Sequence, residues 1–510
     1  MNTFQVFKEL KKKIPKNFFF QLENTIYNLL SSENKLNSFF YFKKIIKNKI
    51  YNLQDLKYLF FIGLILAKYK CYYQSLLIFF YCITKDKNNP DAYFNIGLCF
   101  KNLNKAKLAI IYFNKQEKFF GKNNKLTSEL AKSHQIAGNI QVSEKYYLEL
   151  LTHCNFLFEE HKEYSVIHKY SKDDPHLEML INLEKNDSLE EKNKKFIFFA
   201  LAKAFEDLKD YKKSFNYLKL ANELRKKEVP YSSYLIKKQF LAIKNAYKSI
   251  ILNNDLNIDK GNKIPIKIVG LPRSGTTLLE QIISSHSKVY SMAESLAFPS
   301  CIKQYFPSSD PDQFENEIKN VNYRAVKKFR ETYFKIQFNE TSQNYITDKL
   351  PFNFIFVGLI HKFIPEAKII HIKRNAKDTC ISILKNYFIG KNITFAYSEE
   401  DLVDYYFQYE DLMKFWKNNC PDSFLEISYE DLINNFDISV KKILSFLNLD
   451  FEENIKSFYK NKSSVFSLSL AQVRSPIYKT SLNSWKNFEP YLSDSFKSLP
   501  WYYCKDRTML

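Results

Sequence analysis

The chain has little glycine and proline, and it lacks a long uninterrupted apolar run. Its 510 residues include 9 Gly and 15 Pro. Collagen-like and turn-dense all-β proteins need many of these residues, so the scarcity excludes both and favours long helices with short connections. The most apolar stretch, residues 56–84, is interrupted by Lys68 and other polar side chains. A bilayer-spanning helix needs about 18 or more apolar residues, so no membrane span is predicted.

Cysteine and histidine patterns that bind metals are also lacking. The 8 cysteines never approach C-x-x-C spacing, and the 8 histidines form no H-E-x-x-H pair. The sequence therefore predicts neither a metal site nor a disulfide framework, and it indicates reduced thiols in a cytoplasmic compartment. The first 20 residues have no apolar core followed by small residues, so a secretory signal is not expected.

Apolar and basic residues are abundant. Hydrophobic residues make up 45% of the chain and aromatic residues 17%, so cores can form, and the length predicts roughly two to four domains. The 76 Lys and Arg exceed the 55 Asp and Glu, for a net charge of +21. This excess suggests an anionic partner such as nucleic acid, a membrane surface or a phosphorylated ligand. Net charge alone favours the simpler explanation, which is the solvated helix surface of a Lys- and Asn-rich chain from an AT-rich genome.

A period of 34 residues is present in the N-terminal half. It relates Gly63 to Gly97 and Phe79 to Phe113, and a further unit with the same offsets contains Phe198. In paired-helix repeats, small residues let two helices approach and large ones fill the space between them. The pattern resembles tetratricopeptide repeats, with a generic helical bundle as the alternative. Such a solenoid implies a polypeptide acceptor or partner in its concave face, but no chemistry of its own.

The pattern changes after residue 262. Three short β-branched runs, at residues 264–269, 367–373 and 424–428, alternate with helical patterns. This alternation predicts a parallel α/β sheet with helices on both faces, C-terminal to the all-α solenoid. The predicted parts are a helical segment at 1–55, the solenoid at 56–226, a helical linker at 227–262 and the α/β domain at 263–510.

The junction between the first predicted strand and its helix, IKIVGLPRSGTTLLEQII, predicts an anion site. Gly275 allows close backbone approach, and the helix N-terminus presents N–H groups to an anion. Gly270 and Gly275 have the spacing of a Walker A loop, but Thr276 stands where a kinase has its lysine. A kinase or nucleoside triphosphatase is therefore disfavoured, and another phosphate-bearing ligand is indicated.

This loop resembles the phosphosulfate loop of the sulfotransferase superfamily, PxSGTT. The matching residues are Pro272, Arg273, Ser274, Gly275, Thr276 and Thr277. The resemblance implies a P-loop-like sulfotransferase fold, the co-substrate 3′-phosphoadenosine 5′-phosphosulfate and no metal. In that family an arginine at a strand end and a serine eight residues later bind the 3′-phosphate. Here those positions are Arg374 and Ser382, with Asp378 between them.

Two C-terminal segments carry further resemblance. ISYEDL implies that Tyr429 lies near the phosphates or adenine of the donor. QVRSPIYKTSLNSWKNFEPYL resembles the segment that closes over the nucleotide in the family. The positions carried over from it are Ser469, Arg474, Tyr478 and Trp485.

The resemblance, which covers residues 264–492, is sharpest to the tyrosylprotein sulfotransferases and to bacterial sulfotransferases fused to tetratricopeptide repeats. It implies that Glu294 is the general base. It also implies that Lys349 and Arg273 stabilise charge on the leaving phosphate. Ala293 departs from the pattern, because the tyrosine-specific enzymes have glycine before the base.

The sequence thus predicts transfer of a sulfuryl group to an acceptor hydroxyl, with protein tyrosine the leading acceptor. Carbohydrate or lipid hydroxyls are the alternative acceptors. A non-catalytic, nucleotide-binding repeat scaffold is the alternative from another class. Nucleic-acid binding would rest on net charge alone and is not predicted, and the oligomeric state stays open.

Overall fold

The computed structural model describes residues 53–68, 70–154, 156–186, 188–251, 258–338, 341–390, 393–460, 477 and 479–500. These residues form two compact units, divided between His153 and Cys154. The division falls inside the region 56–226 that the sequence predicts as one solenoid. The helices after Cys154 therefore belong to the unit that holds the sheet.

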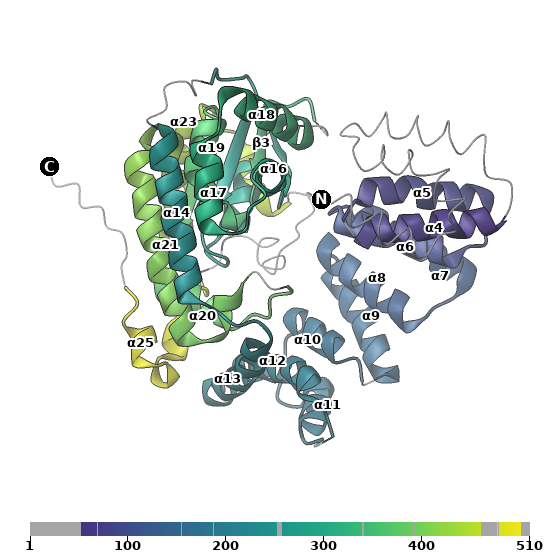
Figure 1. Ribbon diagram of the computed structural model, residues 1–510. Helices are drawn as coiled ribbons and strands as arrows, with labels where there is room; N and C mark the ends of the chain where they lie inside the picture. The colour runs from purple at the N-terminus through teal and green to yellow at the C-terminus, as the bar shows by residue number, and fades with distance from the viewer. Residues whose placement is uncertain are drawn as a thin grey trace. The chain divides into compact units, whose positions relative to one another are not determined.

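The first unit consists, over its described residues, of helices that pack as consecutive pairs (Figure 1). The pairs are α4 (Leu53–Lys68) with α5 (Tyr72–Lys85), α6 (Pro90–Asn102) with α7 (Ala106–Phe120), and α8 (Asn124–Ala137) with α9 (Ile140–His153). Neighbouring pairs also pack on each other, since α5 contacts α6 and α7 contacts α8. This is the serial stacking that a repeat array requires.

The glycines of the 34-residue period lie where an aromatic ring from the partner helix comes closest. A Cβ added to Gly63 would be 2.7 Å from Cε1 of Phe79, and one added to Gly97 would be 2.4 Å from Cε1 of Phe113. Only a residue without a side chain leaves room for either ring. The structure thus has the predicted register, and its assignment to the tetratricopeptide class stays a prediction.

A second contact repeats with the same offset. In three helix pairs a buried serine hydroxyl donates to the carbonyl of the residue twelve positions earlier, on the preceding helix. The bonds are Ser75 to Gly63 (2.7 Å), Ser143 to Ala131 (2.8 Å) and Ser214 to Ala202 (2.7 Å). The third of these lies in the second unit, so the helix-pair geometry continues beyond the division of the chain.

We expect Gly97→Ala to loosen the α6 and α7 pair, because the new methyl group overlaps the ring of Phe113. Overpacking of this kind costs about 1–3 kcal/mol. Hydrogen exchange of α6 and α7 amides in the full chain should accelerate. Asn95→Ala, at an exposed hydrogen bond of the same helix, is the control. Unchanged exchange in Gly97→Ala would show that the helices do not approach as closely as described.

The second unit begins with five helices that precede the sheet. They are α10 (Phe158–Ile167), α11 (Pro175–Glu184), α12 (Glu191–Asp207), α13 (Tyr211–Glu228) and α14 (Ser233–Ile251). Helix α13 is fastened to the α/β part, since Asn222 Nδ2 donates to the carbonyl of Leu384 (3.0 Å) and Arg225 Nη2 to that of Gly390 (2.6 Å). Helix α14 packs along α21 (Glu399–Asn419) (Figure 1).

The sheet has five parallel strands in the order β2-β3-β1-β4-β5. Their bounds are β1 (Ile264–Val269), β2 (Val289–Ser291), β3 (Tyr345–Asp348), β4 (Lys368–Lys373) and β5 (Phe424–Ser428). Strands β1, β4 and β5 confirm the predicted runs. Strands β2 and β3 were not predicted, because three and four residues are too short to show a strand pattern.

Helices and 3-10 turns connect and cover the strands. The α-helices are α15 (Thr276–Ile283), α16 (Ala297–Tyr305), α17 (Pro311–Lys319), α18 (Tyr323–Gln337), α19 (Val357–Phe363), α20 (Ala376–Leu384), α22 (Tyr429–Asn434), α23 (Phe436–Leu447) and α25 (Asp494–Lys497). The 3-10 turns are η2 (Pro351–Phe356), η3 (Thr394–Tyr397), η4 (Pro421–Ser423), η5 (Glu453–Lys460), η6 (Ser484–Asn487) and η7 (Glu489–Tyr491).

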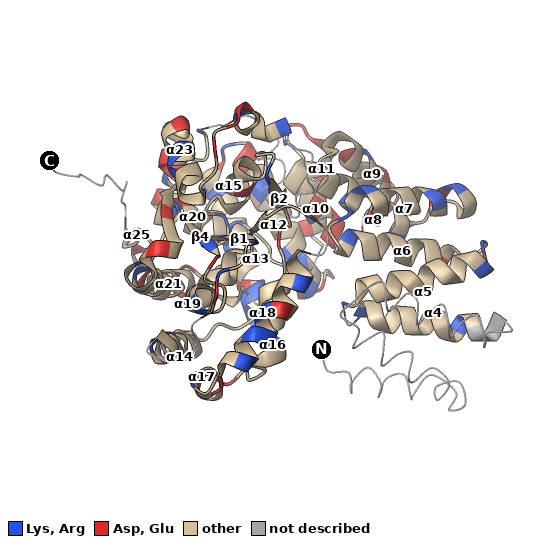
Figure 2. Ribbon diagram, turned by 90° about the horizontal axis from the view of Figure 1, so that it is seen from above, with Lys and Arg blue, Asp and Glu red and all other residues tan. Residues whose placement is uncertain are grey.

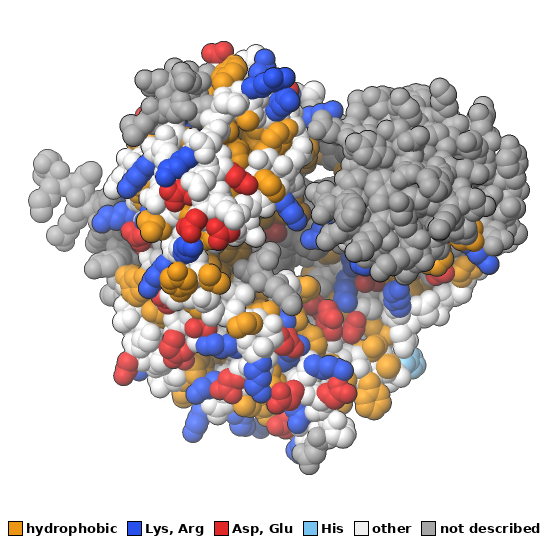
Figure 3. All heavy atoms as spheres, viewed as in Figure 1, with side chains coloured by type: hydrophobic (Ala, Val, Ile, Leu, Met, Phe, Trp, Pro, Cys, Tyr) orange, Lys and Arg blue, Asp and Glu red, His pale blue; other side chains and the backbone are white. Residues whose placement is uncertain are grey.

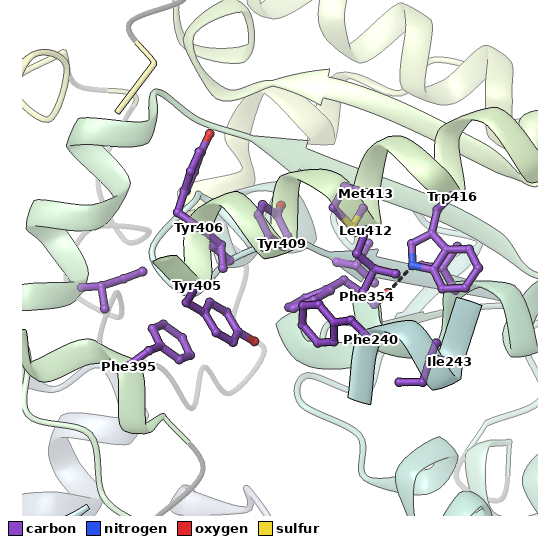
Figure 4. Packing of buried hydrophobic residues seen from close by; sticks show 14 of the residues in the cluster. Phe240, Ile243, Phe354, Phe395, Tyr405, Tyr406, Tyr409, Leu412, Met413 and Trp416 are labelled. Atoms are coloured by element: carbon purple, nitrogen blue, oxygen red, sulfur yellow. Dashed lines mark hydrogen bonds between the residues drawn. The ribbon is translucent and has the colours of Figure 1, made fainter. Parts of the chain in front are cut away.

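Two apolar clusters lie on opposite faces of the sheet. Alternate strand residues divide between them, with Ile268 and Ile372 in one cluster and Val269 and Ile369 in the other. In the larger cluster, Trp416 of α21 packs beside η2 and donates from Nε1 to the carbonyl of Phe354 (2.9 Å) (Figure 4). The predicted fold class, a parallel sheet covered by helices on both faces and preceded by helices, is confirmed.

A buried ion pair joins the central strand β1 to its neighbour β3. Lys267 of β1 and Asp348 of β3 are partners in the strand register, and the ammonium of Lys267 bonds to the carboxylate of Asp348. Both residues are fully buried, and the ammonium also lies 4.7 Å from the ring centre of Tyr333. A one-residue slip of β3 would separate these charges, so the pair specifies the register.

Charged side chains of both signs are interspersed over the helices (Figure 2) and over the face of the second unit shown in Figure 3. Among the described residues, no helix is both long and apolar enough to cross a membrane. None of the seven described cysteines takes part in a disulfide.

Candidate functional site

The candidate residues gather at one edge of the sheet, because each follows the carboxyl end of a strand. Glu294 comes shortly after β2 and Lys349 directly after β3, while Gly270 follows β1, Arg374 follows β4 and Tyr429 follows β5. The carboxyl ends of parallel strands share one edge, which is where α/β folds bind ligands. The strand order therefore sets these groups in a row from Glu294 to Tyr429.

The loop between β1 and α15 needs its two glycines. Gly270 has φ +154°, and a Cβ there would lie 2.8 Å from the carbonyl oxygen of Ile372. Gly275 is left-handed at φ +103°, and its Cβ would lie 2.4 Å from the Tyr429 ring. Thr276 and Thr277 form the buried first turn of α15, and Pro272 is buried in the loop. The loop is thus shaped as the predicted anion cradle.

The two predicted phosphate-binding groups meet in the structure. Arg273 has a left-handed backbone, φ +68°, and its Nε donates to the Ser382 hydroxyl at 3.1 Å. Arg374 Nη1 donates to the carbonyl of Arg273 at 3.0 Å. Left-handed backbone at a residue other than glycine costs about 1 kcal/mol or more and concentrates at functional sites. Residues far apart in sequence are therefore held as one basic cluster.

Two buried polar atoms of this cluster have no hydrogen-bond partner among the described residues. They are the Ser274 hydroxyl and Nε of Arg374. A buried group of this kind is costly unless a ligand or water satisfies it. A hydroxyl and a guanidinium N–H beside the N-terminus of α15 can donate hydrogen bonds to the oxygens of phosphate and sulfate. The residues present therefore fit a phosphosulfate-bearing nucleotide.

Tyr429 and Ser481 border the same cluster. The guanidinium carbon of Arg374 lies 4.9 Å from the ring centre of Tyr429, whose hydroxyl is 3.0 Å from the Ser481 hydroxyl. Arg374 Nη2 donates to the carbonyl of Ser481 at 2.6 Å. Ser481 was missed by the sequence reasoning, although it lies in the segment predicted to close over the nucleotide.

Asp378 has a structural role here. Its carboxylate accepts from the backbone N–H of Asn483 (2.8 Å) and of Trp485 (3.1 Å), and from the Ser484 hydroxyl (3.1 Å). It therefore fastens the C-terminal turn η6 to α20. Trp485 is buried beside Lys377, whose ammonium lies 4.5 Å from the ring centre. Ser469, Arg474 and Tyr478 lie outside the described residues.

Glu294 and Lys349 form an ion pair at the other end of the row. Lys349 Nζ lies 2.6 Å from Oε1 of Glu294, and the Lys349 side chain is 2% exposed while that of Glu294 is 32% exposed. The pairing follows from the strands, since Met292 N–H donates to Thr347 and Lys349 N–H donates to Ala293 (2.9 Å). A carboxylate that faces solvent beside a buried ammonium can accept a proton from an incoming hydroxyl.

The residue before Glu294 has a backbone conformation that favours glycine. Ala293 has φ +51°, a left-handed conformation that glycine adopts without cost. The same residue accepts the Lys349 N–H through its carbonyl, so its conformation aligns both members of the pair. The alanine thus keeps the required shape at an energetic cost of about 1–2 kcal/mol.

We expect Ala293→Gly to keep or raise stability and Ala293→Val to lower it by about 1–3 kcal/mol, because a β-branched residue strongly resists φ above zero. Urea unfolding followed by tryptophan fluorescence measures this in the second unit, where Trp416 is fully buried. A glycine variant less stable than the wild type by more than about 1 kcal/mol would contradict the left-handed conformation.

A second carboxyl is buried behind this pair. Glu280 of α15 is 2% exposed and accepts hydrogen bonds from the hydroxyls of Ser291 (3.0 Å) and Thr347 (3.2 Å). Burial raises the pKa of Glu280 above its ordinary value of 4.5, against the opposing effect of Lys349. Glu280 therefore joins α15 to β2 and β3 underneath the candidate catalytic pair, and no sequence motif indicated it.

The raised pKa of Glu280 makes stability depend on pH. The protonated Glu280 carboxyl contributes fully to the free energy of unfolding below about pH 4.5. This contribution is lost as the pH rises through the pKa of Glu280 in the folded protein. The glutamine of Glu280→Gln does not titrate. We therefore expect the urea midpoint of this variant to rise relative to that of the wild type between pH 5 and pH 8. Glu453→Gln, with a side chain 77% exposed, is the control. Parallel curves for Glu280→Gln and the wild type would contradict the shift.

A cavity of about 350 Å³ opens beside the loop. Its lining includes Arg273, Gly275, Arg374, Ser382 and Tyr429, but neither Glu294 nor Lys349. The cavity therefore lies toward the β4 and β5 end of the row. Over the described ranges, no three His, Cys, Asp or Glu side chains come together as a candidate metal site.

Comparison with known proteins agrees with this geometry. Residues 265–453 match the family model described as "Sulfotransferase family". An uncharacterised Aquifex aeolicus protein is 30% identical over 337 residues, 64% of this chain and 44% of that protein. Protein-tyrosine sulfotransferase 1 of Danio rerio is 23% identical over 242 residues, 43% of this chain and 65% of that protein. The chain thus spans less than half the length of the Aquifex aeolicus relative.

Among solved structures, mouse sulfotransferase SULT7A1 complexed with PAP aligns with 48% of this chain and 86% of its own, at 17% identity and a TM-score of 0.29. The C-terminal part of the chain is therefore similar to the sulfotransferase family over residues 265–453. More narrowly, this domain is similar to the tyrosylprotein sulfotransferases, as the loop and the Glu294 motif predict.

Proposed function

We propose that the protein transfers a sulfuryl group from 3′-phosphoadenosine 5′-phosphosulfate to an acceptor hydroxyl. The acceptor that we propose first is the hydroxyl of a tyrosine in a protein. The observation that carries the donor assignment is the contact between Arg273 and Ser382, beside Arg374. The contact joins the loop after β1 to α20, and Arg374, directly after β4, lines the same cavity. A nucleotide with phosphate at both its 5′ and 3′ positions requires two such groups side by side.

The donor supplies a sulfuryl group whose bond to the 5′-phosphate oxygen breaks as a bond to the acceptor oxygen forms. Glu294 accepts the proton that the acceptor hydroxyl gives up. Lys349 and Arg273 stabilise the negative charge on the leaving phosphate. Since Lys349 bonds to Glu294 in this structure, its ammonium exchanges that carboxylate for the phosphate oxygen as the proton is taken up.

The tyrosine assignment rests on the similarity to tyrosylprotein sulfotransferases and on the left-handed backbone at Ala293, a conformation that suits the glycine expected there from the resemblance. The paired helices of the first unit suit a polypeptide acceptor or partner. Carbohydrate or lipid hydroxyls remain the alternative acceptors, and acceptor screening separates them.

We expect Arg374→Ala/Ser382→Ala to weaken binding of 3′,5′-adenosine bisphosphate by at least about thirtyfold, because the phosphate loses hydrogen bonds worth about 2 kcal/mol or more. Calorimetry in a buffer with a chelator measures this. Lys373→Ala is the control, since Lys373 ends β4 but pairs with Glu410 at 2.8 Å outside the cavity. A folded wild type that does not bind the bisphosphate would overturn the donor assignment.

We expect Glu294→Gln to lower turnover at least about a hundredfold while donor-product affinity stays within about twofold, because a general base contributes about that much and Glu294 lies outside the cavity. Transfer from labelled donor to a tyrosine peptide measures it, with the phenylalanine peptide as control. Wild-type turnover in Glu294→Gln would exclude Glu294 as the base. Donor binding without transfer to peptide, glycan or lipid would favour the alternative function, a non-catalytic, nucleotide-binding repeat scaffold.

A further inference from the structure

Helix α15 is bound to both strands that lead to the candidate catalytic pair. Ser291 of β2 and Thr347 of β3 are partners in the strand register. Both of their hydroxyls donate to the same carboxyl oxygen of Glu280, Oε1, at 3.0 Å and 3.2 Å. Glu294 follows Ser291 by three residues, and Lys349 follows Thr347 by two. One buried carboxyl on the helix after the anion-binding loop therefore contacts both strands just before these two side chains.

The Ser291 hydroxyl connects Glu280 to the backbone before Glu294. A hydroxyl has one proton to donate and two lone pairs that accept. Ser291 gives its proton to Glu280, and its oxygen accepts the N–H of Ala293 at 3.3 Å. Ala293 has the left-handed backbone, φ +51°, that directly precedes Glu294. Glu280 thus supports, through one hydroxyl, the turn that directs the Glu294 carboxylate.

Thr347 makes the corresponding connection on the side of Lys349. Its carbonyl accepts the N–H of Met292 at 3.2 Å, and Lys349 N–H donates to the carbonyl of Ala293 at 2.9 Å. These two backbone bonds continue the contact between β2 and β3 beyond their paired residues. The Thr347 hydroxyl, bound to Glu280, fixes the strand end from which they extend. The spacing of the catalytic pair therefore depends on α15 as well as on the two strands.

Glu280 lies behind the pair, where a substrate does not reach it. It is 2% exposed, and it does not line the cavity beside the loop after β1. Burial raises the pKa of Glu280, while the neighbouring Lys349 lowers this pKa and Glu294 raises it. The three groups are therefore close enough to affect one another. Glu280 is thus placed to position the other two, and it has no access to the reacting atoms.

We propose that Glu280 is a positioning residue of the transfer reaction, which acts on Glu294 through the Ser291 hydroxyl and on Lys349 through the Thr347 hydroxyl. This inference rests on the proposed function and deepens it. Because α15 begins at the anion-binding loop, the same carboxyl also joins the donor cradle to the pair that faces it. Loss of a positioning residue lowers kcat and leaves donor binding in place, because the reacting groups are less often in the reactive geometry.

Turnover and donor-product affinity, measured on the same variants of the full chain, test this inference. Transfer from labelled donor gives kcat, and calorimetry with 3′,5′-adenosine bisphosphate gives the affinity. We expect Glu280→Met, which has no acceptor oxygen, to lower kcat about tenfold or more while the affinity changes less than about twofold. Glu280→Gln keeps an acceptor oxygen for both hydroxyls, so it should retain kcat to within about threefold of the wild type.

Ser291→Ala tests the connection itself. It removes the hydroxyl between Glu280 and Ala293, so we expect kcat to fall by at least about threefold. Glu280→Met/Ser291→Ala should lose much less than the product of the two single losses, because both changes break the same connection. Ile283→Val is the matched control, since it shortens a buried apolar side chain about one turn along α15 and removes no hydrogen bond.

Wild-type kcat in Glu280→Met or in Ser291→Ala would overturn the inference, and Ser291→Ala serves alone if Glu280→Met does not fold. A multiplicative loss in the double variant would overturn it as well. Equal loss of kcat and bisphosphate affinity, or the same loss of kcat in Ile283→Val, would mean that Glu280 only supports the fold of α15. These results leave the proposed function intact, whereas a wild type that transfers to no acceptor would overturn both.

Discussion

The buried pair between Lys267 and Asp348 is the interaction on which the site depends. It locks β3 against β1 in one register, and Lys349 follows Asp348 directly. Because both charges are removed from water, loss of either partner would leave an unpaired buried charge at a cost of about 3–5 kcal/mol. The register of β3 then fixes where Lys349 and, through the adjoining β2, Glu294 emerge from the sheet.

The carboxyl edge of the sheet also contains strained backbone and a buried carboxyl group. Left-handed backbone occurs at Arg273 and Ala293, and Glu280 is buried beneath the Glu294 and Lys349 pair. Each of these features costs free energy in the folded protein. The large apolar clusters on both faces of the sheet offset that cost and hold the edge rigid. A preorganised row of charges is what transfer of an anionic group requires.

The helical part of the chain serves two different purposes. The helices up to His153 form a unit of their own, in which glycine and serine contacts repeat. Helices α12 and α13 keep the same kind of contact at Ser214, yet they belong to the apolar cluster on one face of the sheet and, with α10, line the cavity beside the loop after β1. A repeat pattern describes how neighbouring helices pack, but it does not say which of them adjoin another domain.

The sequence by itself determined the loop from Gly270 to Thr277, the strand before it and the 34-residue register, because each depends on local spacing. It could not show β2 or β3, whose few residues carry too little periodicity. It also gave no signal for Glu280, which resembles an ordinary helix residue in the chain. Only the tertiary structure decided its surroundings, because burial and charge pairing arise when distant segments pack together.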